Sequence, residues 1–156
     1  MLIERQFSYY LMQKLFLSII LFLSPLIIFA QDTKGDQILG QWLNEEKDEK
    51  IELYKTGDRY FGKLIWSAKL MSSDGEISKK DNNNADPKLR SRELIDATIL
   101  NNFAFLNGIW DQGTFYDSKS GKTYSCIIRK KSKKLEIRSF VGIPLFGKST
   151  YWERLE

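Results

Sequence analysis

The sequence predicts an all-β fold, an eight-stranded antiparallel barrel with one short helix in a long loop. Three observations predict it: short apolar segments recur along the chain, turn residues separate them, and one segment carries a glycine where a strand would bend. An antiparallel sandwich would share this pattern. Eight strands is about the smallest number that closes around a small ligand or a filled core, which favours the barrel.

The first three strands are expected at Ile38–Leu43, Ile51–Tyr54 and Arg59–Trp66. Thr56-Gly57-Asp58 separates the second from the third and is typical of a hairpin turn. Side chains alternate in the third strand, so that one face carries Tyr60, Gly62, Leu64 and Trp66. Gly62 indicates a bend or a close backbone approach, as at the corner of a barrel.

A long irregular segment, Ser67–Pro87, follows and is rich in Ser, Asp, Asn, Lys and Gly. Asp86-Pro87 then opens one or two helical turns over Leu89–Leu94. Aspartate at the cap accepts backbone N–H bonds, and proline fits the first helical position because its missing N–H is not needed there. Long loops in compact domains are often functional, and disorder is the alternative.

The second half of the chain is predicted to be rich in strands, at Thr98–Phe105, Gly108–Tyr116, Thr123–Lys130, Leu135–Val141 and Lys148–Leu155. A turn built on Gly142, Pro144 and Gly147 joins the last two. We expect these two strands to close the barrel against the first strand, at Gly40-Gln41-Trp42.

The first thirty residues are predicted to be a secretory signal peptide. Leu15–Ala30 has no charged residue and follows Lys14. This stretch is shorter than the about 20 residues that a membrane-spanning helix needs. Cleavage is expected after Ala30, and an uncleaved N-terminal anchor is the alternative.

The domain organisation follows from this prediction: residues 1–30 as signal peptide, residues 31–37 as a flexible lead-in, and residues 38–156 as the barrel domain. Translation could begin at Met1 or at Met12. We expect an exported protein, periplasmic or secreted, with no transmembrane span after the signal is removed.

The composition argues against several classes of function. A formal net charge of +4 is too small to indicate a nucleic-acid-binding protein. The chain has no histidine, which removes the commonest general base and the usual partner of a catalytic serine or cysteine. The single cysteine, Cys126, cannot form an internal disulfide and is expected to be a small buried residue. We predict no cofactor, no metal and no nucleic-acid partner.

Several motifs recur in an order that is similar to a known bacterial family. They are Gly40-Gln41-Trp42, Gly62 to Trp66, Asp81 to Arg92 with its Asp86-Pro87-Lys88-Leu89-Arg90-Ser91-Arg92 run, Tyr116-Asp117 to Gly121-Lys122-Thr123-Tyr124, and Val141 to Gly147 followed by Trp152. Through them the chain resembles the domain-of-unknown-function family 2147, from about Ile38 to Arg154. Small departures are Ser118, where the family tends to have proline, and Ser139, where glycine is usual.

The resemblance implies a lipocalin-like barrel in an exported protein without an established activity. It also implies a structural seam, in which an arginine late in the chain packs over the tryptophan of the first strand. Arg154 is the positional candidate to lie over Trp42, with Arg138 second. A guanidinium over an indole face contributes about 0.5–2 kcal/mol.

Two sets of residues are candidates for ligand binding. Aromatic side chains could line a cavity for an apolar ligand, namely Trp66, Trp110, Tyr116, Tyr124 and Phe140. The alternative is a solid core in which these rings fill the barrel. Arg90 and Arg92 could hold a carboxylate or phosphate at the barrel mouth, or could instead pair with Asp81 and Asp86.

The sequence shows no recognisable catalytic constellation. We therefore predict a non-enzymatic binding protein of the cell envelope for a small apolar or amphipathic ligand. A module that binds another envelope protein through the 67–96 loop is the first alternative. An enzyme that uses aspartate and arginine groups at the barrel mouth is the second.

Overall fold

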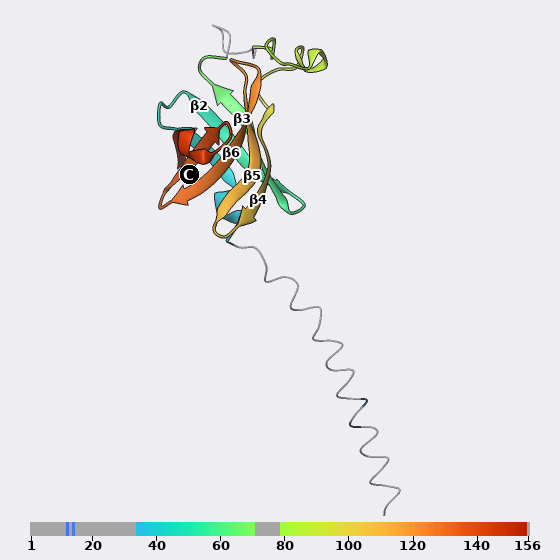
Figure 1. Cartoon of the computed structure of the whole chain (residues 1–156), viewed down its shortest axis with the longest axis vertical. Helices are drawn as coiled ribbons and strands as arrows, with labels where there is room; N and C mark the ends of the chain where they lie inside the picture. Colours follow the sequence, from blue (N-terminus) through green and yellow to red (C-terminus); the bar gives the residue numbers. More distant parts are fainter. Residues whose placement is uncertain (1–11, 13, 15–33, 71–78, 156) are drawn as a thin grey trace, which may run out of the picture. The chain divides into compact units, whose positions relative to one another are not determined.

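The computed structural model describes residues 34–70 and 79–155, together with Met12 and Lys14 (Figure 1). Lys34–Glu156 forms one compact unit and Met1–Thr33 another. Apart from Met12 and Lys14, the expected signal peptide therefore lies outside the described residues. Within the described part of the chain, no helix has the length and apolar character needed to cross a membrane.

Eight antiparallel strands close into a barrel in the order of the chain (Figure 1). They are β1 (Gly40–Asn44), β2 (Glu49–Thr56), β3 (Arg59–Ser67), β4 (Thr98–Leu106), β5 (Ile109–Asp117), β6 (Lys122–Lys131), β7 (Lys134–Phe140) and β8 (Lys148–Arg154). The last strand, β8, returns to pair with β1. The predicted all-β barrel is confirmed. The helix expected over Leu89–Leu94 is shorter and lies earlier in the loop: the 3-10 helix η3 spans Pro87–Leu89, and Glu93 forms an isolated β-bridge with Lys80.

Hairpin turns form where the sequence offers residues that tolerate a left-handed backbone. Gly57 has a φ of 62° between β2 and β3, while Asn107 and Gly108 have φ values of 51° and 87° between β4 and β5. Glycine and asparagine adopt such angles at low cost, and turns with this twist match the twist of the strands that they join. These turns therefore let β2 pair with β3 and β4 pair with β5.

The start of the barrel differs from the prediction. Residues 31–37 were expected to form a flexible lead-in and Ile38 to begin the first strand, but Asp36–Ile38 forms the 3-10 helix η2 and β1 begins at Gly40. Asp36 Oδ1 accepts hydrogen bonds from Lys55 Nζ and Tyr60 Oη, at 2.9 and 2.7 Å. The polar side chain that made this segment look like a linker is thus what fixes η2 to the barrel.

The two ends of the barrel carry different elements. At one end η2 packs beside the β2–β3 hairpin through Asp36, and the carbonyl of Gly35 accepts a hydrogen bond from Trp110 Nε1 at 3.1 Å. The other end carries the β1–β2 turn, the 68–97 loop, the β5–β6 turn and the β7–β8 connection, which contains η4 (Pro144–Phe146). We call these the closed end and the open end.

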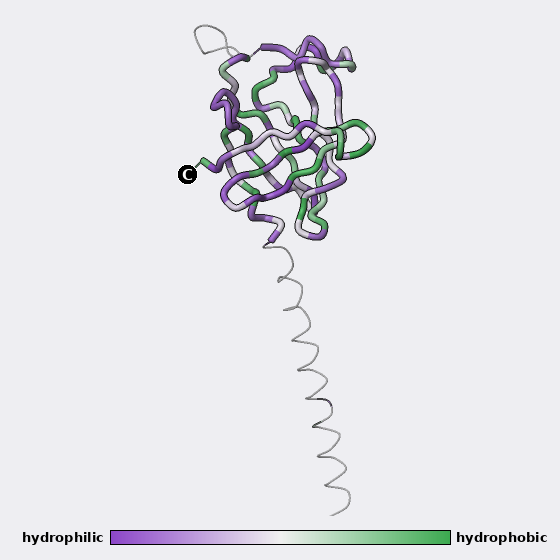
Figure 2. The backbone as a smooth tube through the Cα atoms, turned by 60° about the vertical axis from the view of Figure 1, so that its left-hand side comes forward, coloured by the Kyte–Doolittle hydropathy of each residue, from purple (hydrophilic) through white to green (hydrophobic). Residues whose placement is uncertain are grey.

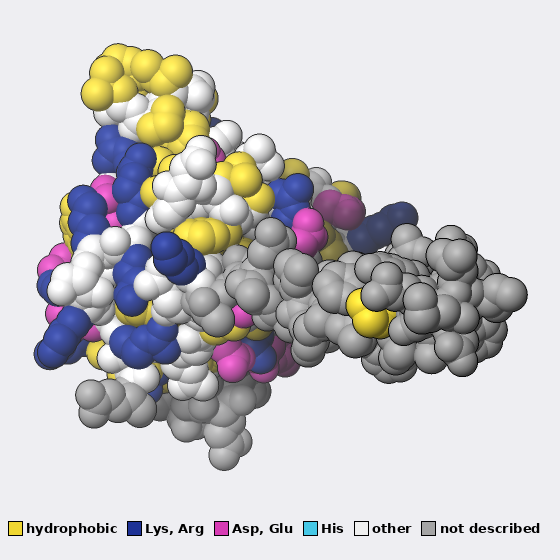
Figure 3. Space-filling view, turned by 90° about the horizontal axis from the view of Figure 1, so that it is seen from below, with side chains coloured by type: hydrophobic (Ala, Val, Ile, Leu, Met, Phe, Trp, Pro, Cys, Tyr) yellow, Lys and Arg dark blue, Asp and Glu magenta, His cyan; other side chains and the backbone are white. Residues whose placement is uncertain are grey.

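The core fills the closed half of the barrel. Its largest fully buried side chains are aromatic, namely Trp42, Trp110, Tyr60 and Phe103. Hydrophobic and hydrophilic positions alternate along the strands, as Figure 2 shows. Acidic and basic side chains are interspersed over the face seen in Figure 3, beside one hydrophobic protrusion. Burial of the alternate apolar positions is the main source of the fold's stability.

A β-bulge near the end of β3 changes which side chains face inward. The pairing of β2 with β3 shifts register between Lys50 and Ile51, so that Ile51 opposes Leu64 and Lys50 opposes Trp66. Alternation from Tyr60 would place Trp66 on the inner face, but the extra residue reverses the pattern, and Ser67 is buried instead. Trp66 lies outside the core under Lys50, whose Nζ is 5.2 Å from the ring.

Candidate functional site: a cavity at the open end

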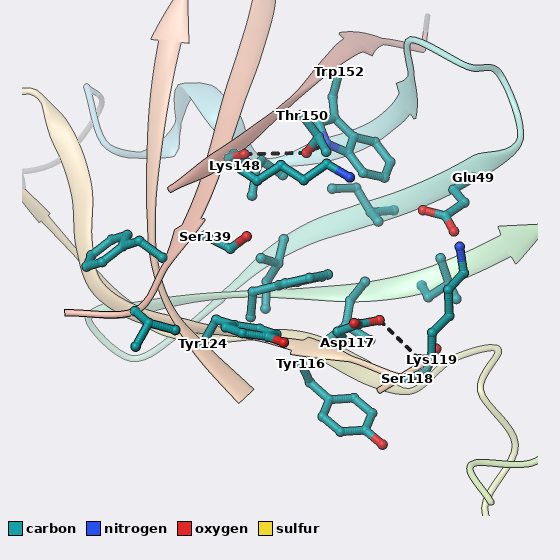
Figure 4. Close-up of a pocket in the computed structure, with 18 of the residues that line it drawn as sticks. Glu49, Tyr116, Asp117, Ser118, Lys119, Tyr124, Ser139, Lys148, Thr150 and Trp152 are labelled. Atoms are coloured by element: carbon teal, nitrogen blue, oxygen red, sulfur yellow. Dashed lines mark hydrogen bonds between the residues drawn. The ribbon is translucent and has the colours of Figure 1, made fainter. Parts of the chain in front are cut away.

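A cavity of about 590 Å³ occupies the open half of the barrel (Figure 4). Its walls are mainly apolar and come from seven of the eight strands and the segments after them, with Ile51, Leu64, Leu70, Ile99, Leu100, Phe115, Ile137, Phe140, Val141, Phe146 and Trp152 among the lining residues. Most of the strand side chains alternate with outward-facing neighbours, which is why strands so distant in sequence contribute to one wall. The barrel is therefore filled at one end and hollow at the other.

The mouth of the cavity is charged. Glu49 begins β2, Lys119 lies in the β5–β6 turn and Lys148 begins β8. Glu49 and Lys119 point toward one another across the mouth, and Lys148 lies beside Thr150 and Trp152 (Figure 4). Among the described residues, no carboxylate lies within ion-pair distance of Lys148. The cavity thus combines an apolar interior with a cation at its entrance.

Glu49 has an unusual environment for a carboxylate. Burial raises the pKa of Glu49 above its ordinary value, and the negative charge of Asp48 raises it further. Lys119 and Lys69 oppose this effect without cancelling it. Glu49 therefore takes up a proton at a higher pH than an exposed glutamate would.

Replacing Glu49 with glutamine should make the protein relatively more stable as the pH rises. A carboxyl whose pKa is raised in the folded state contributes stability at low pH, and this contribution is lost as the pH rises through that pKa. Relative to that of the wild type, the free energy of unfolding of Glu49→Gln should therefore increase as the pH rises above about 4. Urea unfolding at a series of pH values measures the free energy of unfolding of both proteins. If the value for Glu49→Gln minus that for the wild type falls as the pH rises, the raised pKa of Glu49 is contradicted.

Three of the predicted ligand-binding residues line the cavity: Tyr116, Tyr124 and Phe140. The Tyr124 ring reaches into the cavity, whereas the Tyr116 ring borders it and points away (Figure 4). The Tyr116 hydroxyl instead donates a hydrogen bond to Asp81 Oδ1. Tyr124 and Phe140 are thus the members of the aromatic set that are placed to touch a ligand.

The other predicted ligand-binding residues are not among those that line the cavity. Trp110 is fully buried at the closed end, where its ring packs edge-on against Tyr60, with 6.3 Å between centroids. Trp66 is turned outward by the β-bulge. Arg90 Nε donates to the carbonyl of Asn84 at 2.8 Å, and Arg92 forms an ion pair with Asp81 at 2.8 Å. The two arginines hold the loop rather than face the cavity.

Asp81 is the centre of a buried polar network that joins the long loop to β5. Its carboxylate is fully buried and accepts hydrogen bonds from Tyr116 Oη, Asn84 Nδ2 at 2.7 Å and Arg92 Nε at 2.9 Å. Burial alone would raise the pKa of Asp81, but these donors together hold it below its ordinary value. Burial and the bond to Asp81 raise the pKa of Tyr116 to about 12.

This network also fixes the mouth of the cavity. Asn83, two residues after Asp81, donates from Nδ2 to the carbonyl oxygens of Ser118 and Lys119, at 3.3 and 3.0 Å. The β5–β6 turn, which carries Lys119 at the mouth, is therefore attached to the described part of the loop. An enzyme at this position would need an available carboxylate, but that of Asp81 already binds three donors.

The closing seam joins the first and last strands. Trp42 is opposite Arg154 in the β1–β8 pair, and the guanidinium lies over the indole ring, 4.6 Å from its centroid. Arg154 also donates to the carbonyl oxygens of Leu39 and Gln37, at 2.8 and 2.6 Å. Arg138, the second candidate, lies in β7 and donates to carbonyl oxygens of the β7–β8 connection.

The environment of Cys126 does not favour a reactive thiol. Cys126 is buried, and burial raises the pKa of its thiol to about 12, so that almost no thiolate forms near neutral pH. No group of three or more carboxylate or thiol side chains able to hold a metal ion occurs within residues 34–70 and 79–155.

Sequence reasoning missed most of the cavity lining, including the charged side chains Glu49, Lys119 and Lys148 at the mouth and the ring of Trp152. Lys148, Thr150 and Trp152 stand two apart in a predicted strand, so alternation alone could have placed them on one face. Glu49 precedes the predicted second strand, Ile51–Tyr54, and the structure extends β2 to include it. Lys119 lies in a turn, where no periodicity predicts direction.

Comparison with known proteins agrees with the observed fold. The family model described as "Uncharacterized protein conserved in bacteria (DUF2147)" matches residues 40–154. Among solved structures, the chain is similar to one described as "Protein HP1028 from the human pathogen Helicobacter pylori belongs to the lipocalin family". The TM-score is 0.67 at 25% identity, over 76% of this chain and 83% of that one. The search of curated proteins found no match.

Proposed function

Because the chain belongs to the bacterial family DUF2147 and has a lipocalin-like barrel, we propose that it is an exported binding protein for a small amphipathic ligand. The observation that carries the proposal is the cavity of about 590 Å³ in the open half of the barrel. This volume lies within the range of about 300–1,000 Å³ that is usual for small-molecule sites. The apolar N-terminal segment supports export to the periplasm or beyond.

The lining indicates which chemical class of ligand would bind. Apolar side chains such as Leu64, Leu100 and Ile137 surround the interior, so an alkyl or other apolar body would be buried there. Lys148 stands at the mouth without a carboxylate partner among the described residues. An ammonium in this position would pair with a carboxylate or another anionic head group. The ligand is therefore an amphipath with an apolar body and an anionic head.

The direct test is to identify a bound molecule and then to block its site. Mass spectrometry of organic extracts from the purified protein should detect an amphipathic compound. Ser139→Trp places a large ring in the cavity, whereas Ser125→Trp makes the same change at an exposed position of the neighbouring strand. We expect the first variant to lose binding of decanoate in calorimetry and the second to keep it. Equal binding by both folded variants would overturn the cavity assignment.

The role of Lys148 is tested by changing the charge of the protein and of the ligand separately. Lys148→Gln should weaken decanoate binding by about tenfold, the equivalent of about 1.4 kcal/mol, because a charge-assisted hydrogen bond is lost. Decan-1-ol, which has no charge, should bind both proteins equally. Lys122→Gln is the control, since Lys122 is exposed on β6 and is not part of the cavity lining. An equal loss for acid and alcohol would assign Lys148 to packing instead.

A further inference from the structure

The connection between β7 and β8 exposes an unusual amount of apolar surface. Val141, Ile143, Leu145 and Phe146 are 76%, 53%, 73% and 80% exposed. Single apolar residues on a surface need no explanation, but four in one short segment indicate an interaction site. We refer to residues 141–147 as the apolar tip. The tip is the hydrophobic protrusion at the upper left of Figure 3 and is also hydrophobic in Figure 2.

The structure holds the apolar tip in a defined conformation. Arg138 donates from Nε to the carbonyl of Pro144 at 2.7 Å and from Nη2 to the carbonyl of Leu145 at 3.0 Å. Its Nη1 donates to Ser149 Oγ at 2.8 Å. One arginine on β7 thus fastens both η4 and the start of β8, so the apolar side chains are presented to solvent instead of folding back on the barrel.

The shape and charge of the tip fit a lipid surface. The tip is convex, so a protein partner would need a matching groove, whereas a fluid bilayer accepts any protruding apolar side chain. The strand segments on both sides carry Arg138 and Lys148, and the sequence from Ile137 to Tyr151 contains no aspartate or glutamate. Cations next to an apolar wedge favour membranes that contain anionic lipids.

The tip is also continuous with the cavity. Val141 and Phe146 line the mouth and are at the same time among the most exposed apolar residues of the described chain. A surface that receives the tip therefore lies directly against the mouth. This continuity distinguishes the tip from Leu89 and Leu106, which are exposed singly in other parts of the barrel.

We propose that the apolar tip inserts into the surface of an anionic lipid bilayer and thereby brings the mouth of the cavity to the lipid headgroups. The four apolar side chains enter the boundary between headgroups and acyl chains, and Arg138 and Lys148 lie at the level of the phosphates. Docking places the cavity where an amphipath can pass between membrane and barrel without crossing water. The docking itself does not depend on whether a ligand occupies the cavity.

The test uses Gln31–Glu156, the chain that the predicted cleavage after Ala30 would leave, which contains the complete barrel and its core. Its binding is measured by co-sedimentation with vesicles of phosphatidylcholine and phosphatidylglycerol, and with vesicles of phosphatidylcholine alone. The double variant Leu145→Ser/Phe146→Ser removes two of the exposed side chains of the tip. Leu89→Ser/Leu106→Ser is the control, because it also replaces two exposed apolar side chains with serine, but away from the tip.

We expect binding to the anionic vesicles to fall about tenfold or more in the tip variant and to stay unchanged in the control. Added salt should weaken wild-type binding, since it screens the cations. Ser139→Trp should still bind vesicles, so a failure of the ligand proposal and a failure of the docking proposal can be told apart. Equal binding by tip variant and control would overturn the proposal, as would equal binding to neutral vesicles.

A second copy of the chain is the alternative binding partner of the apolar tip. In that case the wild type would be a dimer without lipid by light scattering, and the tip variant a monomer. This result would overturn the proposal, whereas a monomeric wild type that binds anionic vesicles supports it. Circular dichroism of each variant shows that the barrel is folded before binding is compared.

Discussion

Replacing Trp42 with alanine should lower the free energy of unfolding by about 3–5 kcal/mol, the usual cost of deleting a buried aromatic ring. The side chain is 1% exposed, and its Nε1 donates to the carbonyl of Ile38 at 2.8 Å. The variant leaves a large cavity at the closed end and removes the ring that supports Arg154. Thermal unfolding should show a melting temperature lower by about 10 °C or more.

Substitutions of Arg154 measure its own contribution to the stability of the seam, apart from that of the Trp42 ring. Arg154→Ala should cost about 1–3 kcal/mol, because the variant loses the contact with Trp42 and leaves two carbonyl oxygens without their donor. Arg154→Lys keeps the charge but not the planar fork, so it should recover only part of this loss. Unchanged melting temperatures in both Trp42→Ala and Arg154→Ala would refute the seam.

Replacing Asp81 with alanine is the second change from which we expect a large effect, a loss of about 2–4 kcal/mol. The variant leaves Tyr116, Asn84 and Arg92 facing a position without an acceptor. Unfolding in urea measures the loss. Asp86→Ala is the matched control in the same loop, since Asp86 only caps η3 through Lys88 N and should cost about 1 kcal/mol.

The same network predicts a dependence on acid. A carboxyl whose pKa is lowered on folding contributes stability above its unfolded pKa, and the contribution is lost as the pH falls through the folded pKa. Asp81 is such a group. The stability advantage of the wild type over Asp81→Asn should therefore shrink as the pH is lowered below about 4. An advantage that is constant down to about pH 2 would show that folding does not lower the pKa of Asp81.

Much of this fold could be predicted because strand patterning is local. Apolar alternation and Gly- or Asn-containing turns identified all eight strands, and the family resemblance gave the barrel its type. The face of Trp66 could not be predicted, because the β-bulge that turns it outward depends on pairing with β2 and not on any residue nearby in sequence. The 3-10 helix η2 (Asp36–Ile38) was missed for a similar reason, since Asp36 binds residues about twenty positions away.

The candidate site was predicted less well than the fold. Aromatic content suggested a lined cavity, but it does not distinguish rings that fill the closed end, such as Trp110, from rings at the open end, such as Tyr124. For Arg90 and Arg92, the sequence left open whether they bind a ligand or pair with nearby aspartates. The structure shows that Arg92 forms an ion pair with Asp81. The Val141–Gly147 segment was interpreted as a turn that joins the last two strands. In the structure, most of the surface of its apolar side chains is exposed.

The pairing of β1 with β8 affects when the barrel can close during synthesis of the chain. The two strands lie more than a hundred residues apart, so the ring closes only after almost the entire sequence is available. Until then β1 and the growing edge expose unpaired N–H and C=O groups that can template aggregation. Secretion through a translocation channel passes the chain unfolded and releases it whole. A barrel whose first and last strands pair with each other is compatible with the export that we propose.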